Sequence, residues 1–268
     1  MHSDQFGVLL KGTKEDLERA CELWSKQPID SDLVDGHTIV PAKHQTTLAR
    51  PVSLTGPGTF FSKSQRTLTL EPSESEGWWL DRADLPDYLP TKVAIHNVWT
   101  TGKIVRNIVL RSGPPENYIR MVEHMIALKI GIGIDNLVLR LDSGDPPLFK
   151  KSSLALVEGV EKAGVHQLER RPRYLTVKET VSIVGPNDDF LSISPCTGPE
   201  PKLIIDCAVD FSNVIGQQRI RFPLTYEHFR EGAKARTNTT AAKRLYCRSI
   251  GQIFADIRNL GYTDENIL

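Results

Sequence analysis

A carboxylate and an imidazole stand side by side at Glu123 and His124. Apolar residues recur at helical spacing through this stretch, which predicts an amphipathic helix with the pair in its first turn. A carboxylate beside an imidazole suits metal-assisted hydrolysis, with the imidazole as ligand and the carboxylate as proton acceptor for a bound water. The same dipeptide is also ordinary on a solvated helix surface, because a hydrolytic zinc needs about three protein ligands.

The residues after the pair predict the elements that position it. Gly131 and Gly133 favour the end of the helix. The segment 134–142 then alternates between leucines and other residues, which predicts a strand with one buried face. We therefore expect a helix and a strand that pack on each other and leave Glu123 and His124 at the start of the helix.

Composition restricts the class of protein. Of 268 residues, 40% are hydrophobic, and Lys plus Arg equals Asp plus Glu at 33 each, so no bulk charge indicates nucleic acid or an anionic membrane. No apolar run approaches the ~18 residues of a membrane span, and the first residues are unlike a signal peptide. The 4 cysteines are far apart, which argues against a disulfide framework or a thiolate zinc site. We expect a cytoplasmic protein without stable membrane insertion.

The fold class that we expect is α+β, with two domains of similar topology, each a β-sheet packed on two α-helices. Residues 1–50 are predicted to be an appendage with one helix, which Thr13 caps and Pro28 ends, and which docks on the main body. Residues 51–170 form the first α+β domain, including a strand at 92–98. Residues 171–268 form the second, which includes a strand at 173–178 and which we expect to be incomplete.

Several motifs occur in the order in which they occur in a known enzyme family. They are T-G-P-G at residues 55–58, W-L-D-R-A-D-L-P at 79–86, V-E-H-M at 122–125, G-I-G-I-D-N at 131–136, D-P-P-L at 145–148 and A-R-T at 235–237. Together they resemble the zinc-dependent UDP-3-O-acyl-N-acetylglucosamine deacetylase family of lipid A biosynthesis. Ordered motifs over most of a chain are far more specific than one Glu-His pair.

The resemblance implies a fold, a reaction and a set of residues. It implies two domains of like topology with an active site between them, and removal of acetate from the nitrogen of a UDP-linked acylated amino sugar. His124 would be a Zn²⁺ ligand and Glu123 the general base. Thr237 and its neighbour Arg236 would bind the substrate.

The chain also departs from the family pattern. The family's H-K-x-x-x-D helix, which supplies two further zinc ligands, has no counterpart, and Lys150 and Lys151 replace an acid and a glycine. Tight zinc binding by one ligand out of about three is not expected. A catalytically inactive relative, or a fragment that acts as a binding or assembly module, is therefore the alternative, with self-association or a partner that supplies the missing part.

Two other groups could carry function. The first is a basic cluster that could hold the diphosphate of the substrate or form a solvated helix face: Arg230, Lys234, Arg236, Lys243, Arg244 and Arg248. The second is Glu227 with His228, which repeats the order of Glu123 and His124, and for which a solvated position on a capped helix is the simpler interpretation.

Overall fold

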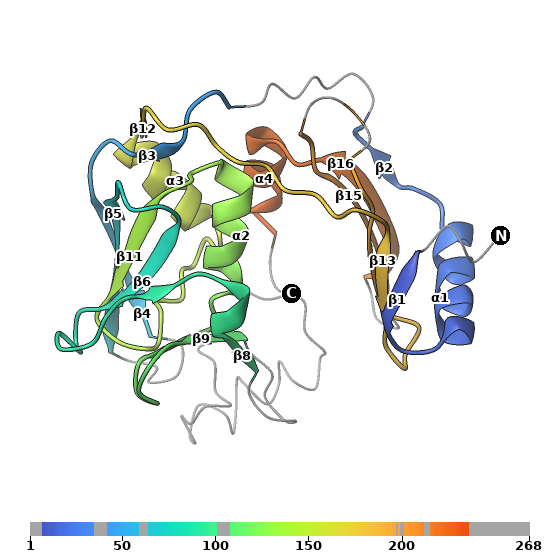
Figure 1. Cartoon of the computed structure of the whole chain (residues 1–268), viewed down its shortest axis with the longest axis horizontal. Coiled ribbons are helices and arrows are strands. Elements are labelled where there is room, and N and C mark those ends of the chain that lie inside the picture. Colours follow the sequence, from blue (N-terminus) through green and yellow to red (C-terminus); the bar gives the residue numbers. More distant parts are fainter. Residues whose placement is uncertain are drawn as a thin grey trace. The chain divides into compact units, whose positions relative to one another are not determined.

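The computed structural model describes residues 7–34, 42–58, 64–100, 108–196, 198, 201–211 and 215–235 (Figure 1). The chain folds into two compact units. Unit 1 contains Met1–Ala42 and Arg173–Leu224, and unit 2 contains Lys43–Pro172 and Thr225–Leu268. The expected α+β class is confirmed, since both units combine strands with helices. The predicted domain ranges 1–50, 51–170 and 171–268 stay a prediction.

Unit 2 is built around a five-stranded sheet with the order β4-β5-β11-β6-β7, in which β11 runs antiparallel to β5 and parallel to β6. Two smaller sheets, β10-β9-β8 and β12-β3, contain the other strands in its described residues. The elements of unit 2 are β3 (Thr46–Leu48), β4 (Val52–Pro57), β5 (Gln65–Pro72), β6 (Trp78–Arg82), β7 (Thr91–Lys92), the 3₁₀ helix η2 (Ile95–Asn97), β8 (Val98–Thr100), β9 (Ile108–Arg111), β10 (Tyr118–Arg120), α2 (Glu123–Ile132), β11 (Leu137–Leu141), α3 (Leu154–Ala163), β12 (Val165–Gln167) and α4 (Tyr226–Gly232).

The core of unit 2 lies between this sheet and the helices α2 and α3 (Figure 1). Alternate residues of β5, β6 and β11 are buried against Leu128 of α2 and Val157 of α3. The intervening residues carry charge on the other face, where Arg140 pairs with Glu71 and Asp81. This period-two alternation is the pattern of a sheet with one buried face, as the sequence predicts for residues 134–142.

Two predicted strands are wrong. The segment 92–98 is interrupted, because η2 (Ile95–Asn97) separates β7 from β8. Asn97 donates its side-chain amide to the carbonyl of Lys92, a bond that favours this local turn over an extended chain. Residues 173–178 form no strand, and the extended segment of this region begins at Val181.

The described residues of unit 1 form two three-stranded sheets and one helix. The sheet orders are β1-β13-β14 and β15-β16-β2, and both outer strands β1 and β2 pair in parallel with their neighbours. Its elements are β1 (Val8–Lys11), α1 (Lys14–Lys26), β2 (Ser31–Asp32), β13 (Val181–Val184), β14 (Phe190–Ile193), β15 (Ile204–Phe211) and β16 (Gly216–Pro223). The N-terminal segment therefore supplies one strand to each sheet, with α1 between them.

Helix α1 forms as its sequence predicts. Thr13 caps it, since its hydroxyl accepts a hydrogen bond from the amide of Asp16 at 3.1 Å. Leu17 and Cys21 are buried against Val184 of β13. Burial raises the pKa of the Cys21 thiol to about 11, so this cysteine is an unreactive core residue.

Arg219 of β16 connects α1 to the β15–β16 pair. Its guanidinium makes two hydrogen bonds to Asp206, at 2.9 and 2.8 Å, and lies 3.9 Å from the ring centroid of Trp24. The same side chain donates to the carbonyl oxygens of Trp24 and Gln27 at the end of α1. The bonds to these two carbonyls span 195 and 192 positions of the sequence, so the N-terminal segment is an integral part of unit 1.

We expect Arg219→Met to lower the free energy of unfolding by about 2 kcal/mol, because it leaves Asp206 and two helix-end carbonyls without this donor. Arg221→Met is the matched control on the same strand, since Arg221 is more exposed and contacts Asp32 at 3.4 Å, and it should cost well under ~1 kcal/mol. Urea unfolding followed by tryptophan fluorescence measures both. Equal effects of the two substitutions would contradict this role.

Candidate functional site

The turn that follows α2 is held by side chains that bond to backbone. Gly133 ends the helix in the left-handed conformation, with φ 68° and ψ 28°. The carboxylate of Asp135 then accepts a hydrogen bond from the backbone amide of Thr46 at 2.8 Å. The side-chain oxygen of the buried Asn136 accepts one from the backbone amide of Gly77 at 2.8 Å. Asn136 also donates to the side chain of Gln45 at 3.0 Å. The D-N pair of the motif at residues 131–136 therefore fixes the end of α2 to strands on both sides.

Gly131 has a different role from the predicted helix stop. It lies inside α2, and a Cβ at this position would come within 2.1 Å of the ring of Phe229 on α4. The absence of a side chain lets α4 approach α2 closely. The prediction that Gly131 ends the helix is wrong, whereas Gly133 ends it as predicted.

Glu123 lies half-buried in the first turn of α2. One of its carboxylate oxygens, Oε1, accepts a hydrogen bond from the backbone amide of Ile108, at the start of β9, at 2.9 Å. Negative charge at the first turn of a helix is favourable because the unpaired N–H groups there carry partial positive charge. This backbone contact fixes the carboxylate, and among the described residues nothing else bonds to it.

His124 follows on the same turn and contacts α3. Its Nδ1 lies 2.6 Å from the hydroxyl oxygen of Ser153, the residue before α3. The residue as a whole is exposed, but packing around the ring removes part of its hydration and lowers the pKa of His124. The carboxylate of Glu123 acts in the opposite direction and offsets part of that effect. The neutral imidazole is thus favoured in the folded protein.

Two motifs that are far apart in the sequence meet at the loop before α3. Gly58, the last residue of T-G-P-G, forms an antiparallel bridge with Pro147 of D-P-P-L, and the amide of Leu148 donates to the carbonyl of Pro57 at 2.8 Å. A side chain on Gly58 would contact Asp145 and Arg66 at 3.2 and 3.1 Å, so glycine permits this approach. Both motifs therefore shape the loop that leads into α3.

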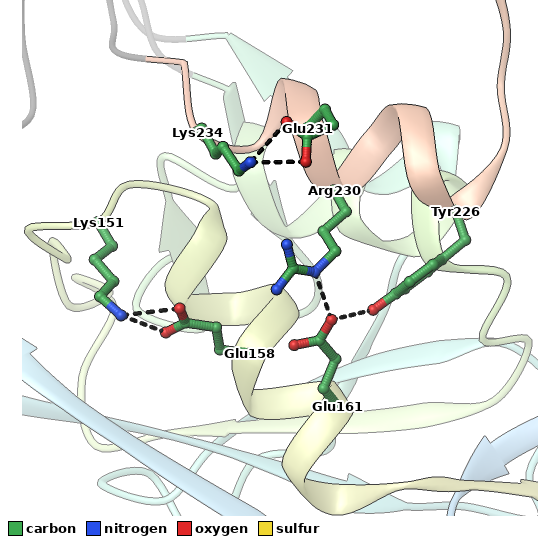
Figure 2. A network of polar contacts seen from close by, with 7 residues as sticks. All are labelled: Lys151, Glu158, Glu161, Tyr226, Arg230, Glu231 and Lys234. Carbon is green, nitrogen blue, oxygen red and sulfur yellow. Dashed lines mark hydrogen bonds and ion pairs between the residues drawn. The ribbon is translucent and has the colours of Figure 1, made fainter.

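Figure 2 shows how α4 is attached to α3. Glu161 of α3 contacts two residues of α4. Its carboxylate accepts a short hydrogen bond from the hydroxyl of Tyr226 and forms an ion pair with Arg230 at 2.7 Å. Lys234, two residues past the end of α4, pairs with Glu231 of that helix at 2.6 Å. Arg230 and Lys234, the two members of the basic cluster in the described part of the chain, thus already have acidic partners, which fits a solvated helix face.

The other predicted site residues are distributed as follows. Arg236 and Thr237 lie outside the described residues, as do the last three members of the basic cluster. His228 lies on α4, where its amide donates to the capping hydroxyl of Thr225 at 3.2 Å. Lys151 pairs with Glu158 of α3 at 2.8 Å (Figure 2). Sequence reasoning missed Ser153 as a partner of His124, because no local spacing relates residues 29 positions apart.

The described residues do not fit a complete metal site. Within those ranges no three histidine, cysteine, aspartate or glutamate side chains gather in a way that could hold a metal ion. His124 is one imidazole with one carboxylate beside it, whereas zinc takes four ligands with tetrahedral geometry. Among the same residues no helix is long and apolar enough to cross a membrane.

A carboxylate and an imidazole held side by side at the start of a helix in an α+β fold are side chains that a hydrolase can use, and comparison with known proteins identifies the family. The sequence model described as UDP-3-O-acyl N-acetylglycosamine deacetylase matches residues 45–255, which is most of the chain. The chain therefore belongs to this family, as the order of its motifs indicates. The N-terminal segment that builds α1 lies outside the matched range.

Individual relatives that the chain resembles carry the name of the same enzyme. The chain is 31% identical to UDP-3-O-acyl-N-acetylglucosamine deacetylase of Campylobacter hominis over 196 residues, 72% of this chain and 62% of that protein. It is 30% identical to the enzyme of that name from Helicobacter pylori over 226 residues, 83% of this chain and 72% of the relative. The Brucella ovis enzyme is 26% identical over 84% of this chain and 74% of its own length. The match to the first relative thus spans less than two thirds of that protein.

The lowered pKa of His124 predicts a pH dependence of stability. Protonation of the ring is harder in the folded than in the unfolded chain, so its cost appears as pH falls from the unfolded value of about 6.5 through the lowered folded value. Melting temperatures between pH 7.5 and 5 should fall more steeply for the wild type than for His124→Asn. NMR titration of the ring checks the direction. A folded pKa above 6.5 would contradict it.

Proposed function

We propose that the chain hydrolyses the acetamide of a UDP-linked acylated amino sugar, with Glu123 as the proton acceptor and His124 as the residue that presents a ring nitrogen to the reacting centre. Family membership supports the reaction class. The observation that carries the proposal is the arrangement of the pair, since a backbone amide holds the carboxylate and a hydroxyl holds the ring. Such fixed orientations are what acid–base catalysis requires.

The chemistry for Glu123 is proton transfer from the attacking water. Ile108 occupies Oε1 through its backbone N–H, and within the described ranges Oε2 accepts no hydrogen bond. The bonded oxygen fixes the plane of the carboxylate, and the other is available to take the proton of water and pass it to the departing amine. Because Glu123 and His124 are consecutive in the first turn of α2, the contacts with Ile108 and Ser153 fix both side chains at the same end of this helix.

For the metal we propose only what the residues permit. Family resemblance implies Zn²⁺, and His124 is the described residue that would ligate it. The described residues do not supply the remaining ligands, so the metal enters no step of this reaction scheme. Arg236 and Thr237 are proposed as substrate-binding residues on the resemblance of A-R-T alone.

A catalytically inactive relative is the second candidate, because no three ligand-type side chains gather among the described residues and Lys151 pairs with Glu158 where the family has a glycine. Such a protein would act as a binding or assembly module. Its support is an apolar face of unit 1, where residues of one sheet remain exposed: Val8, Leu10, Ile183, Leu191 and Ile193. Self-association or a protein partner, and a cytoplasmic location, remain part of this proposal.

We expect Glu123→Gln to lower the rate of acetate release from UDP-3-O-acyl-N-acetylglucosamine by at least ~100-fold, because the amide retains the Ile108 contact but cannot take a proton. Folding should be unchanged, as circular dichroism and the melting temperature would show. Glu71→Gln is the matched control, since Glu71 pairs with Arg140 on the opposite face of the sheet, and it should keep the wild-type rate.

The outcome separates the two candidates. Acetate release that Glu123→Gln abolishes and Glu71→Gln preserves supports the hydrolase. No release by wild-type protein supplied with Zn²⁺, together with measurable binding of the same nucleotide sugar, would favour the inactive relative. A wild-type rate in Glu123→Gln would exclude the role given to this carboxylate.

A further inference from the structure

Ser153 stands where a serine ordinarily caps a helix, and it does not do so. At the residue before a helix, a serine hydroxyl usually accepts a first-turn N–H. No such bond is made at the start of α3. The first amides of α3 are instead bonded to backbone carbonyls, with Leu154 donating to Lys151 at 3.2 Å and Ala155 to Ser152 at 3.3 Å. The hydroxyl of Ser153 is therefore not needed as a cap.

That hydroxyl bonds to His124 instead. Its oxygen lies 2.6 Å from Nδ1, so the contact joins the first turn of α2 to the residue before α3. A neutral imidazole has one N–H donor and one lone-pair acceptor, and the partner of one nitrogen decides the state of the other. Ser153 occupies Nδ1, and within the described part of the chain no residue bonds to Nε2.

We propose that Ser153 is a positioning residue for His124: it accepts the Nδ1–H proton and so leaves Nε2 as the unprotonated nitrogen that faces the reacting centre. This rests on the proposed function, in which His124 uses a ring lone pair. A histidine that works through one ring nitrogen characteristically donates from the other to a fixed oxygen. The short loop before α3 and the helix α2 both contribute to this arrangement.

The backbone on either side of the contact is strained. Met121, just before α2, has φ 49°, and Ser152, just before Ser153, has φ 53°. Non-glycine residues seldom adopt this conformation, and they persist in it where the surroundings enforce it. The two strained residues lead directly into the two turns that bring Nδ1 and the hydroxyl together.

The test is the ring tautomer, measured by ¹⁵N–¹H multiple-bond NMR correlation of labelled full-length chain at pH 8.5. In the wild type we expect Nδ1 protonated and Nε2 unprotonated. Ser153→Ala should move the population toward the Nε2–H form, and Ser153→Thr, which retains a hydroxyl, should restore the wild-type pattern. Ser152→Ala is the matched control, since it removes the adjacent hydroxyl and should leave the ring unchanged.

An Nε2–H ring in the wild type would overturn the inference, because the hydroxyl would then be the donor. An unchanged ring in Ser153→Ala would overturn it as well. If the hydrolase is active, Ser153→Ala should lower kcat/KM about 10-fold and Ser153→Thr should recover it. The expected tautomers in a protein that releases no acetate would refute the proposed function and leave this inference standing.

Discussion

The turn that ends α2 is the constraint on which the arrangement of unit 2 depends. Its side chains Asp135 and Asn136 hold it between the start of β3 and the residue before β6, because they accept hydrogen bonds from the amides of Thr46 and Gly77. Trp78 adds a third contact, since its indole N–H donates to the carbonyl of Ile134 at 2.7 Å. A buried amide without its partners costs about 1–3 kcal/mol, so these bonds specify one register for the turn. The position of α2, which begins with Glu123, depends on that register because the helix runs directly into the turn.

This dependence separates two kinds of motif in the family pattern. The residues at 131–136 perform no chemistry: Gly131 admits Phe229, Gly133 reverses the chain, and Asn136 is buried. Their effect is to place the pair at 123–124, for which we propose a chemical role. The T-G-P-G and D-P-P-L segments act in the same way on the loop before α3, through the bridge between Gly58 and Pro147. The motifs in the described part of the chain thus serve mainly as a scaffold around the two side chains for which we propose a chemical role.

The sequence predicts those features that depend on local spacing. Alternation of leucines predicts β11, and the Thr13 cap of α1 appears as expected, because each involves residues within one turn or one strand. Features that depend on tertiary contacts cannot be predicted from the sequence alone. Gly131 resembles a helix stop until Phe229 is seen against it, and Ser153 resembles an ordinary cap until His124 is found beside it. The pairing of β1 with β13 and of β2 with β16 joins segments that no local pattern relates.

The most direct measurement of this account is the response of the His124 ring to Asn136→Ala, a substitution at the other end of α2. If the turn after α2 positions the helix, Asn136→Ala should lower the free energy of unfolding by about 2 kcal/mol. The variant should also lose the ¹⁵N signature of the contact between Nδ1 and Ser153. Its helix content should stay close to that of the wild type. Asn97→Ala, which removes a half-buried side-chain amide bonded to the carbonyl of Lys92, should lower the free energy of unfolding by well under about 1 kcal/mol and leave the His124 ring unchanged. A variant at Asn136 with wild-type stability and an unchanged His124 ring would contradict the account.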